Sequence, residues 1–369
     1  MKKLLILIII PFVMISQVEE RKYCGASQIL EEALKDPKKK QILQQLEIFT
    51  KDFIATLDKE TRGGTYIIPV VVHIIHNYGV ENISYEQIDN GIFRMNEDFN
   101  AENDDLSEVI SEFQTIIGNV NMRFRLATKD PDGNCTYGVT RTGSSLTQGG
   151  AVEEIMSLVN WPSDQYVNIY VVTSFPEWAS QFAAFATYPA GGSEEYGDYI
   201  FCRYDYFGDW DINSNSGPTG NNWSRHTMSH EMGHFFNLKH PWGGTNEPAL
   251  DENCELDDGV EDTPKTIGTS NLCPLNQSTC DGSLDNVQNI MEYSSCGHMF
   301  TQGQDDRMIA AANSFAGNRV DLWQEDNLEL TGTDDNSFNS EPYAECAPEP
   351  DFNSVINLLC QGEQILFNN

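Results

Sequence analysis

A run of eleven residues, from His230 to His240, constrains this chain more than any other feature. It reads H-E-M-G-H-F-F-N-L-K-H, with three histidines at fixed spacing and a glutamate directly after the first. Residues four apart share one face of a helix, so His230 and His234 can bind one metal ion together. Because the whole chain has only 7 histidines, a chance match to this pattern is rare. The run predicts a zinc-binding active-site helix, with Glu231 as general base for a water that the ion activates.

The third zinc ligand cannot come from the same straight helix. His226 also precedes His230 by four residues, but it lies about 12 Å from His234 along the helix axis at a rise of 1.5 Å per residue. Two nitrogens bound to one zinc can be at most about 4 Å apart, given bonds near 2.1 Å. We therefore interpret His226 as a structural helix residue and expect His240 to complete the site after a turn. Asn237 suits that turn because Asn enters the left-handed conformation more readily than other non-Gly residues.

Together with a downstream segment, the run resembles the zinc signature and Met-turn of the metzincin metalloproteases. The downstream segment, residues 289–293, reads N-I-M-E-Y, and its Met291 matches the methionine beneath the metal. Asn237 stands where the metzincin pattern has Gly, which the turn geometry allows. Further segments are similar to the pappalysin branch of the metzincins: Ile68 to His73, Asn96 to Asn100, Asp130 to Asn134, Cys296 to Thr301 and Gln304 to Met308. The resemblance covers roughly residues 20 to 325.

The resemblance implies an α+β fold of the metzincin type, with a twisted mixed sheet, backing helices and the active-site helix in an upper part. The lower part, after His240, is expected to be rich in loops and stapled by disulfides. Residue patterns agree with the upper part, since apolar or alternating runs predict strands at 66–75, 122–126 and 167–172. Helices are expected from Ser84 to Phe99, over 223–236 and over 304–315.

The resemblance further implies a secreted zinc-dependent endopeptidase that is made as a zymogen and hydrolyses peptide bonds of proteins or peptides. Glu231 would take a proton from the attacking water and pass it to the leaving amine. Tyr293 matches a tyrosine that some metzincins place near the metal, where it could donate to the tetrahedral oxyanion.

Two other interpretations of the segment His230 to His240, called the zinc run below, stay open. In a gluzincin-type peptidase, a downstream glutamate would replace His240 as the third ligand. Alternatively, the chain is a non-catalytic secreted protein that binds zinc for structure. Structural zinc sites usually fill all four positions with Cys or His, so Glu231 beside only three nearby ligands disfavours that interpretation.

The N-terminal segment predicts export and latency. The chain is apolar from Leu4 to Ile15 behind a short basic end, a signal-peptide pattern too short to span a bilayer, and we expect the signal peptide to be residues 1–17. Residues 18–62 resemble the propeptide of pappalysin zymogens, in which Cys24 would bind zinc as a fourth ligand and exclude the catalytic water. A free or disulfide-bonded N-terminal cysteine is the alternative.

Three further units are expected after the propeptide. The catalytic domain would occupy residues 63–328. Residues 329–343 form a polar, acidic linker in this interpretation. Residues 344–369 resemble the start of a truncated PKD-like β-sandwich, of which too few residues are present for a complete module.

Nine cysteines in an exported chain predict disulfides with one cysteine left over. Spacing alone allows three pairings of the four cysteines near the Met-turn. In pappalysins the first pairs with the third and the second with the fourth. The expected bridges are Cys254–Cys280 and Cys273–Cys296 from the resemblance, and Cys346–Cys360 and Cys135–Cys202 among the remaining cysteines.

An acidic turn at residues 256–263, L-D-D-G-V-E-D-T, concentrates oxygen donors that suit a hard cation. Pappalysins carry structural calcium in the corresponding loop, so the resemblance implies Asp258, Asp262 and Thr263 as ligands. A solvated acidic loop is an equally good interpretation.

The charge of the chain excludes some partners. Lys and Arg total 22 against 56 Asp and Glu, a net charge of -34. Such acidity argues against nucleic acid and anionic membranes as partners. After the expected signal peptide, no run is apolar and long enough for a transmembrane helix. The sequence does not indicate an oligomeric state.

Overall fold

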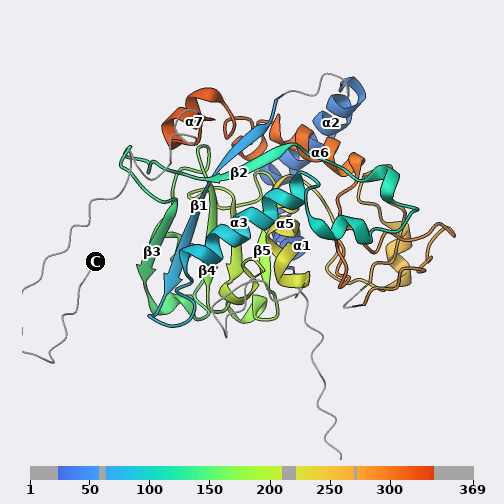
Figure 1. Ribbon diagram of the computed structural model, residues 1–369, viewed down its shortest axis with the longest axis horizontal. Helices are drawn as coiled ribbons and strands as arrows, with labels where there is room; N and C mark the ends of the chain where they lie inside the picture. The colour runs from blue at the N-terminus through green and yellow to red at the C-terminus, as the bar shows by residue number, and fades with distance from the viewer. Residues whose placement is uncertain (1–23, 58–63, 210–221, 270–271, 336–369) are drawn as a thin grey trace, which may run out of the picture.

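The computed structural model describes residues 24–57, 64–209, 222–269 and 272–335 (Figure 1). The predicted signal peptide, the cleavage segment before Gly63, the C-terminal module and the Cys346–Cys360 bridge lie outside these residues. Among the described residues, no helix is long and apolar enough to cross a membrane.

A mixed sheet of six strands forms the centre of the described part of the chain. The strands follow the order β2-β1-β4-β6-β5, with β3 also pairing with β1. Every pairing is parallel except that of β5, which runs antiparallel to β6 at one edge. The strands are β1 (Tyr66–His76), β2 (Met122–Leu126), β3 (Val139–Gly143), β4 (Val167–Val172), β5 (Ala184–Ala186) and β6 (Tyr199–Arg203).

The central strands β1 and β4 are buried on both faces of the sheet, which explains their near-continuous apolar runs. On one face lie α3 (Tyr85–Phe99) and α5 (Asn222–Phe235), which pack against each other (Figure 1). Ser84 begins α3, because its hydroxyl accepts a hydrogen bond of 3.2 Å from the backbone N–H of Gln87. The other helices are α1 (Ala26–Ala33), α2 (Pro37–Thr56), α4 (Val152–Met156), α6 (Gln302–Ala312) and α7 (Glu325–Thr331).

The α+β fold and the predicted strands are therefore confirmed, with small differences at helix ends. Helix α6 starts two residues earlier than expected, because Thr301 and Gln304 form a capping box at its N-terminus. Helix α7 runs to Thr331, past the boundary at residue 328 that the sequence predicted for the catalytic domain. Its C-terminal residues belong to the fold, since the backbone N–H of Thr128 donates to the Thr331 carbonyl at 3.0 Å.

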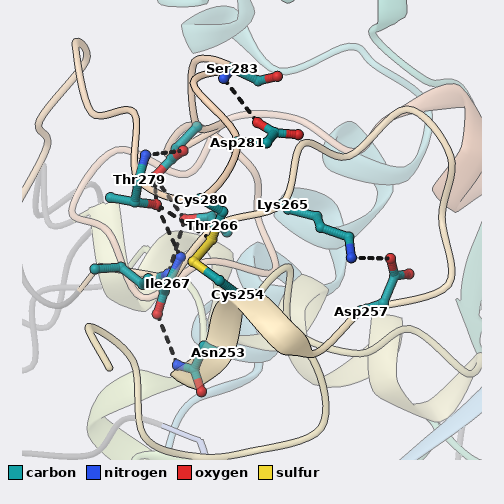
Figure 2. The surroundings of a disulfide bond; sticks show 12 residues. Asn253, Cys254, Asp257, Lys265, Thr266, Ile267, Thr279, Cys280, Asp281 and Ser283 are labelled. Atoms are coloured by element: carbon teal, nitrogen blue, oxygen red, sulfur yellow. Dashed lines mark hydrogen bonds and ion pairs between the residues drawn. A yellow bond between two sulfur atoms is a disulfide. The ribbon is translucent and has the colours of Figure 1, made fainter. Parts of the chain in front are cut away.

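The lower part, which follows the zinc run (His230 to His240), has little regular structure and is held by disulfides. The structure contains both bridges that the resemblance implied, Cys254–Cys280 and Cys273–Cys296. Figure 2 shows the first of them beside the amide of Asn253, which donates to the carbonyl of Ile267 at 3.0 Å. Nearby, Lys265 and Asp257 form an ion pair at 3.8 Å (Figure 2).

The expected Cys135–Cys202 bridge is wrong. Cys202 is a free thiol, completely buried in β6 between two neighbouring strands, whereas Cys135 is bonded to another cysteine. The Cys202 side chain packs in the core between the sheet and its helices, where a loop cysteine cannot reach it. Spacing in the sequence does not reveal this burial.

Candidate metal centre

The turn after α5 brings the third histidine back beneath the helix. Asn237 adopts the left-handed conformation, with φ of 72°. The backbone N–H of Leu238 donates to the Gly233 carbonyl at 2.9 Å, which closes the end of the helix. Arg307 of α6 fixes the turn from outside, because its Nε donates to the Asn237 carbonyl at 2.7 Å.

Three imidazoles converge after this turn, those of His230, His234 and His240. The Nε2 atom of His234 lies 3.1 Å from Nε2 of His230 and 3.2 Å from Nε2 of His240. Ligand atoms bound tetrahedrally at 2.0–2.1 Å lie about 3.4 Å apart, so this spacing fits one zinc ion. All three side chains are buried, and burial lowers the pKa of each, that of His230 to about 4. The rings are therefore neutral, which metal binding requires.

Each ring is oriented through its other nitrogen. Every Nδ1 faces a backbone carbonyl, which favours the tautomer that leaves Nε2 free for a metal. The distances are 2.8 Å from His230 to Ile290, 2.7 Å from His234 to Leu238 and 3.2 Å from His240 to Thr245.

Two aromatic residues that the sequence did not single out support the same rings. The Tyr188 hydroxyl lies 3.1 Å from Nδ1 of His234, and the Trp242 ring stacks on His240 with centroids 4.5 Å apart. Trp242 follows the zinc run by two residues and could have been suspected from that proximity. Tyr188 carries no such signal, because it comes from the loop after β5.

The Met-turn lies directly beneath α5. Met291 is fully buried, and a Cβ atom at position 233 would lie 2.6 Å from its sulfur. The helix can approach the Met-turn this closely only because Gly233 has no side chain. Gly233 is thus a site residue that was not predicted from the sequence, although it lies between His230 and His234.

Cys24 lies at the same centre. Its Sγ atom and one nitrogen of each histidine, His230, His234 and His240, all lie within 4.8 Å of one another. The segment around it adds to the sheet edge, since Cys24 forms a parallel bridge with Ala184 of β5 and the next N–H donates to the Ala184 carbonyl at 3.0 Å.

Glu231 and Tyr293 complete the described centre. Glu231 is buried beside β5, and burial raises the pKa of its carboxyl to about 8 despite hydrogen bonds from the Cys24 thiol and the Ala186 backbone. The Tyr293 hydroxyl donates to the Cys24 carbonyl at 3.1 Å. A carboxylate and a phenol therefore face the position where a metal, a water or a peptide carbonyl would react.

The structure separates the three expected calcium ligands into two hydrogen-bonded groups. Thr263 donates to the Asp258 carboxylate at 2.7 Å. Asp262 instead accepts from the Thr301 hydroxyl at 2.6 Å and from the Gly303 backbone at 2.9 Å, at the N-terminus of α6. Their assignment to calcium stays a prediction.

Comparison with known proteins agrees with this geometry. The sequence profile of the peptidase family described as pregnancy-associated plasma protein-A matches residues 150–313, which include the zinc run and the Met-turn. The extracellular metalloprotease of Verticillium alfalfae is 32% identical over 157 residues, which are 39% of this chain and 49% of the relative. That of Sordaria macrospora is 36% identical over 98 residues, 25% of this chain and 32% of the relative. The chain thus spans a third to a half of the length of these relatives.

Two solved structures match far more of the chain. A mutant of Tannerella forsythia promirolysin superposes with a TM-score of 0.70 and 28% identity, covering 84% of this chain and 99% of that one. Mature mirolysin in complex with a cleaved peptide gives a TM-score of 0.63 and 30% identity, over 73% and 99% of the two chains. Fold and site together define a metalloprotease of the metzincin type. The chain belongs to the pappalysin family.

Proposed function

We propose that this chain is a secreted, zinc-dependent endopeptidase that its own N-terminal segment keeps latent. One observation carries the proposal: the nitrogens of three histidines and the thiol of Cys24 converge within 4.8 Å beside a buried glutamate. Catalytic zinc sites have three permanent protein ligands and one position that opens for water or substrate. A thiol on a separable segment suits that fourth position.

In the proposed hydrolysis, the histidines and Glu231 have separate roles. His230, His234 and His240 would hold the zinc, which when bound supplies Lewis-acid polarisation of water and of the scissile carbonyl. Glu231 accepts a proton from the attacking water and delivers it to the leaving amine. The raised pKa of its carboxyl favours both halves of this transfer, because a stronger base accepts the proton readily and still releases it.

Tyr293 would stabilise the oxyanion. Its hydroxyl already donates to a backbone carbonyl at the centre, that of Cys24, at 3.1 Å. We infer that the carbonyl of a bound substrate replaces the Cys24 carbonyl after activation. The same donor would then face the oxygen on which negative charge develops.

Latency follows from the position of the N-terminal segment. Cys24 would bind the zinc as fourth ligand and exclude the catalytic water. Its neighbours also occupy the edge of β5, where an extended substrate peptide could add as a further strand. Cleavage before Gly63 would release both obstructions, and the match to promirolysin supports a zymogen of this kind.

The names of the relatives, extracellular metalloproteases, support secretion and protein or peptide substrates for this chain. The gluzincin alternative is disfavoured because Nε2 of His240 lies 3.2 Å from Nε2 of His234. His240 can therefore serve as the third metal ligand, and no glutamate is required in that position. The non-catalytic alternative does not explain why the carboxyl of Glu231 is buried beside the histidines. Structural calcium at Asp258, Asp262 and Thr263 remains part of the proposal.

The test compares processed wild type with Glu231→Ala for zinc content and for casein hydrolysis before and after chelation. The variant should keep as much zinc as wild type and lose hydrolysis by about 10²- to 10⁴-fold, the usual contribution of a general base. Glu255→Ala, which removes an exposed carboxylate from the lower part, is the matched control and should stay active. An active Glu231→Ala enzyme would overturn the role of Glu231, and hydrolysis that survives complete removal of zinc would overturn the zinc mechanism.

A further inference from the structure

One helical turn before the zinc run, α5 contributes to a second cluster of metal-ligating side chains. His226 meets Asp105, from the short helix η1 (Asp104–Glu108), and His298, from the segment after the Met-turn. One ligand atom of each lies within 4.8 Å of the other two; both histidines are buried, and the Asp105 side chain is 10% exposed. The sequence predicts only a structural role for His226 and gives no signal for a metal site at Asp105 or His298.

The three side chains aim at one point. Oδ2 of Asp105 lies 3.1 Å from Nε2 of His226 and 3.1 Å from Nδ1 of His298. The other oxygen of Asp105 is already bound, because the amide of Asn103 donates to it at 2.5 Å. The carboxylate therefore presents a single, oriented oxygen between two imidazoles.

Asp98 of α3 decides which nitrogen of His226 is available. Its carboxylate lies 2.8 Å from Nδ1 of His226, so that nitrogen carries the donated proton. A neutral imidazole has only one N–H, and Nε2 then presents a lone pair to the Asp105 carboxylate, which is also an acceptor. A carboxylate behind a histidine whose other nitrogen points at a shared centre is the usual support of a metal ligand.

Two acceptors can face each other at 3.1 Å only if a cation stabilises them. Two carboxylates, those of Asp98 and Asp105, face the two nitrogens of His226 at 2.8 and 3.1 Å. The cluster thus requires a positive charge, which either an extra proton or a metal ion can supply. The separations of 3.1 Å would suit a metal ion as well as a hydrogen bond, since the edge of a tetrahedron with bonds of 2.0–2.2 Å is about 3.4 Å.

We propose that Asp105, His226 and His298 form a second metal site, distinct from the catalytic centre, that binds zinc for structure. Two imidazoles and one carboxylate suit zinc or cobalt better than calcium, which prefers oxygen ligands alone. A water completes the fourth position.

The site would connect three segments that are remote in the sequence. Its ligands lie 121 residues apart between Asp105 and His226, and 193 apart between Asp105 and His298. His226 also borders the pocket beside the catalytic histidines, together with Thr227, Ile290 and Ser294. A bound ion would hold the wall of this pocket in place, so its loss should loosen the binding of substrate side chains.

The test counts zinc per chain in the full-length protein by mass spectrometry after dialysis, with zinc as the only added metal. Wild type should hold two equivalents, and His298→Gln and His230→Gln one each. His76→Gln, which replaces a buried histidine outside both clusters, should keep both. Circular dichroism shows whether each variant is folded.

Anomalous scattering from wild-type crystals at the zinc edge gives an answer that needs no variant. A peak between Asp105, His226 and His298 supports the proposal. A single equivalent of zinc in wild type, unchanged in His298→Gln, with no peak there, shows a protonated ion-pair cluster instead and overturns it. Because His230→Gln reports the other centre, failure of the second site is distinguishable from failure of the proposed catalytic zinc.

Discussion

The Sγ atom of Cys24 lies 3.6 Å from Oε2 of Glu231, across 207 residues of sequence. The thiol that would block the metal thus also contacts the base that would activate water. In the proposed mechanism, one side chain would thus obstruct both steps of catalysis. The N-terminal segment would then act at the chemical centre itself and not only on access to it.

Replacing Cys24 with Ala should make the uncleaved precursor an active protease. The side chain would no longer compete for the fourth metal position or contact the general base. Hydrolysis of a fluorogenic peptide by intact precursor measures this directly. The matched control is Cys202→Ala, which removes another buried free thiol and should leave the precursor latent. A Cys24→Ala precursor as inactive as wild type would contradict the switch.

Glu47 of α2 anchors the N-terminal segment to the catalytic part. Arg307 of α6 donates to both of its carboxylate oxygens and also to the carbonyl of Asn237 in the zinc run. Glu47→Gln should weaken docking by about 1.5–3 kcal/mol, the usual value for hydrogen bonds to charged groups, and speed activation. Time courses of proteolytic processing would measure the change.

An exposed ion pair at the same junction provides the control for Glu47. Lys38 lies 3.7 Å from Glu194, with both side chains about three-quarters exposed. Such pairs contribute little, so Glu194→Gln should process at the wild-type rate. Equal effects of the two variants would show that net charge, not the Arg307 contact, governs release.

Tyr293→Phe should lower kcat of the processed enzyme by about 10²- to 10³-fold without loss of zinc, as expected for an oxyanion donor. Steady-state kinetics on one peptide, with zinc content, would test this. Tyr166→Phe is matched, because it also removes a hydroxyl that donates to a backbone carbonyl, that of Lys129 at 3.0 Å, in a separate cluster of the core. An unchanged kcat for Tyr293→Phe would show that the Tyr293 hydroxyl does not stabilise the oxyanion and that the residue contributes only to packing.

His73 should make the fold sensitive to acid. Burial lowers its pKa to about 4, whereas an unfolded histidine titrates near 6.5. Between these values the unfolded chain binds more protons, so the stabilising contribution is full above about pH 6.5 and is lost as pH falls towards 4. Between pH 6.5 and 4, the contribution of His73 to the free energy of unfolding should fall by up to about 1.4 kcal/mol per pH unit.

Denaturant unfolding of wild type and His73→Gln between pH 7 and pH 4.5 would show the effect of His73. The difference in unfolding free energy between the two proteins should shrink or reverse as pH falls, because the variant has nothing to titrate at this position. A difference that is constant with pH would contradict the assignment. The neutral ring is well accommodated, with nitrogens 2.8 Å from Thr140 and from Asn168.

Prediction from sequence succeeded where the physical cause is local. The i, i+4 spacing of His230 and His234 requires only a helix, and the turn to His240 requires only one residue in the left-handed conformation. Ser84 could be recognised as a helix start for the same reason. The Cys254–Cys280 and Cys273–Cys296 bridges came from family resemblance, since spacing left three pairings open.

The sequence by itself determined the three histidines, the glutamate beside them and the main strands and helices, because periodicity and turn chemistry act over a few residues, whereas the metzincin type of fold came from family resemblance. Only the tertiary structure decided that Cys24 reaches Glu231, that Tyr188 supports His234 and that Cys202 stays unpaired. These outcomes depend on strand order and on which side chains the core buries. Both arise from contacts between distant segments, for which the local pattern carries no signal.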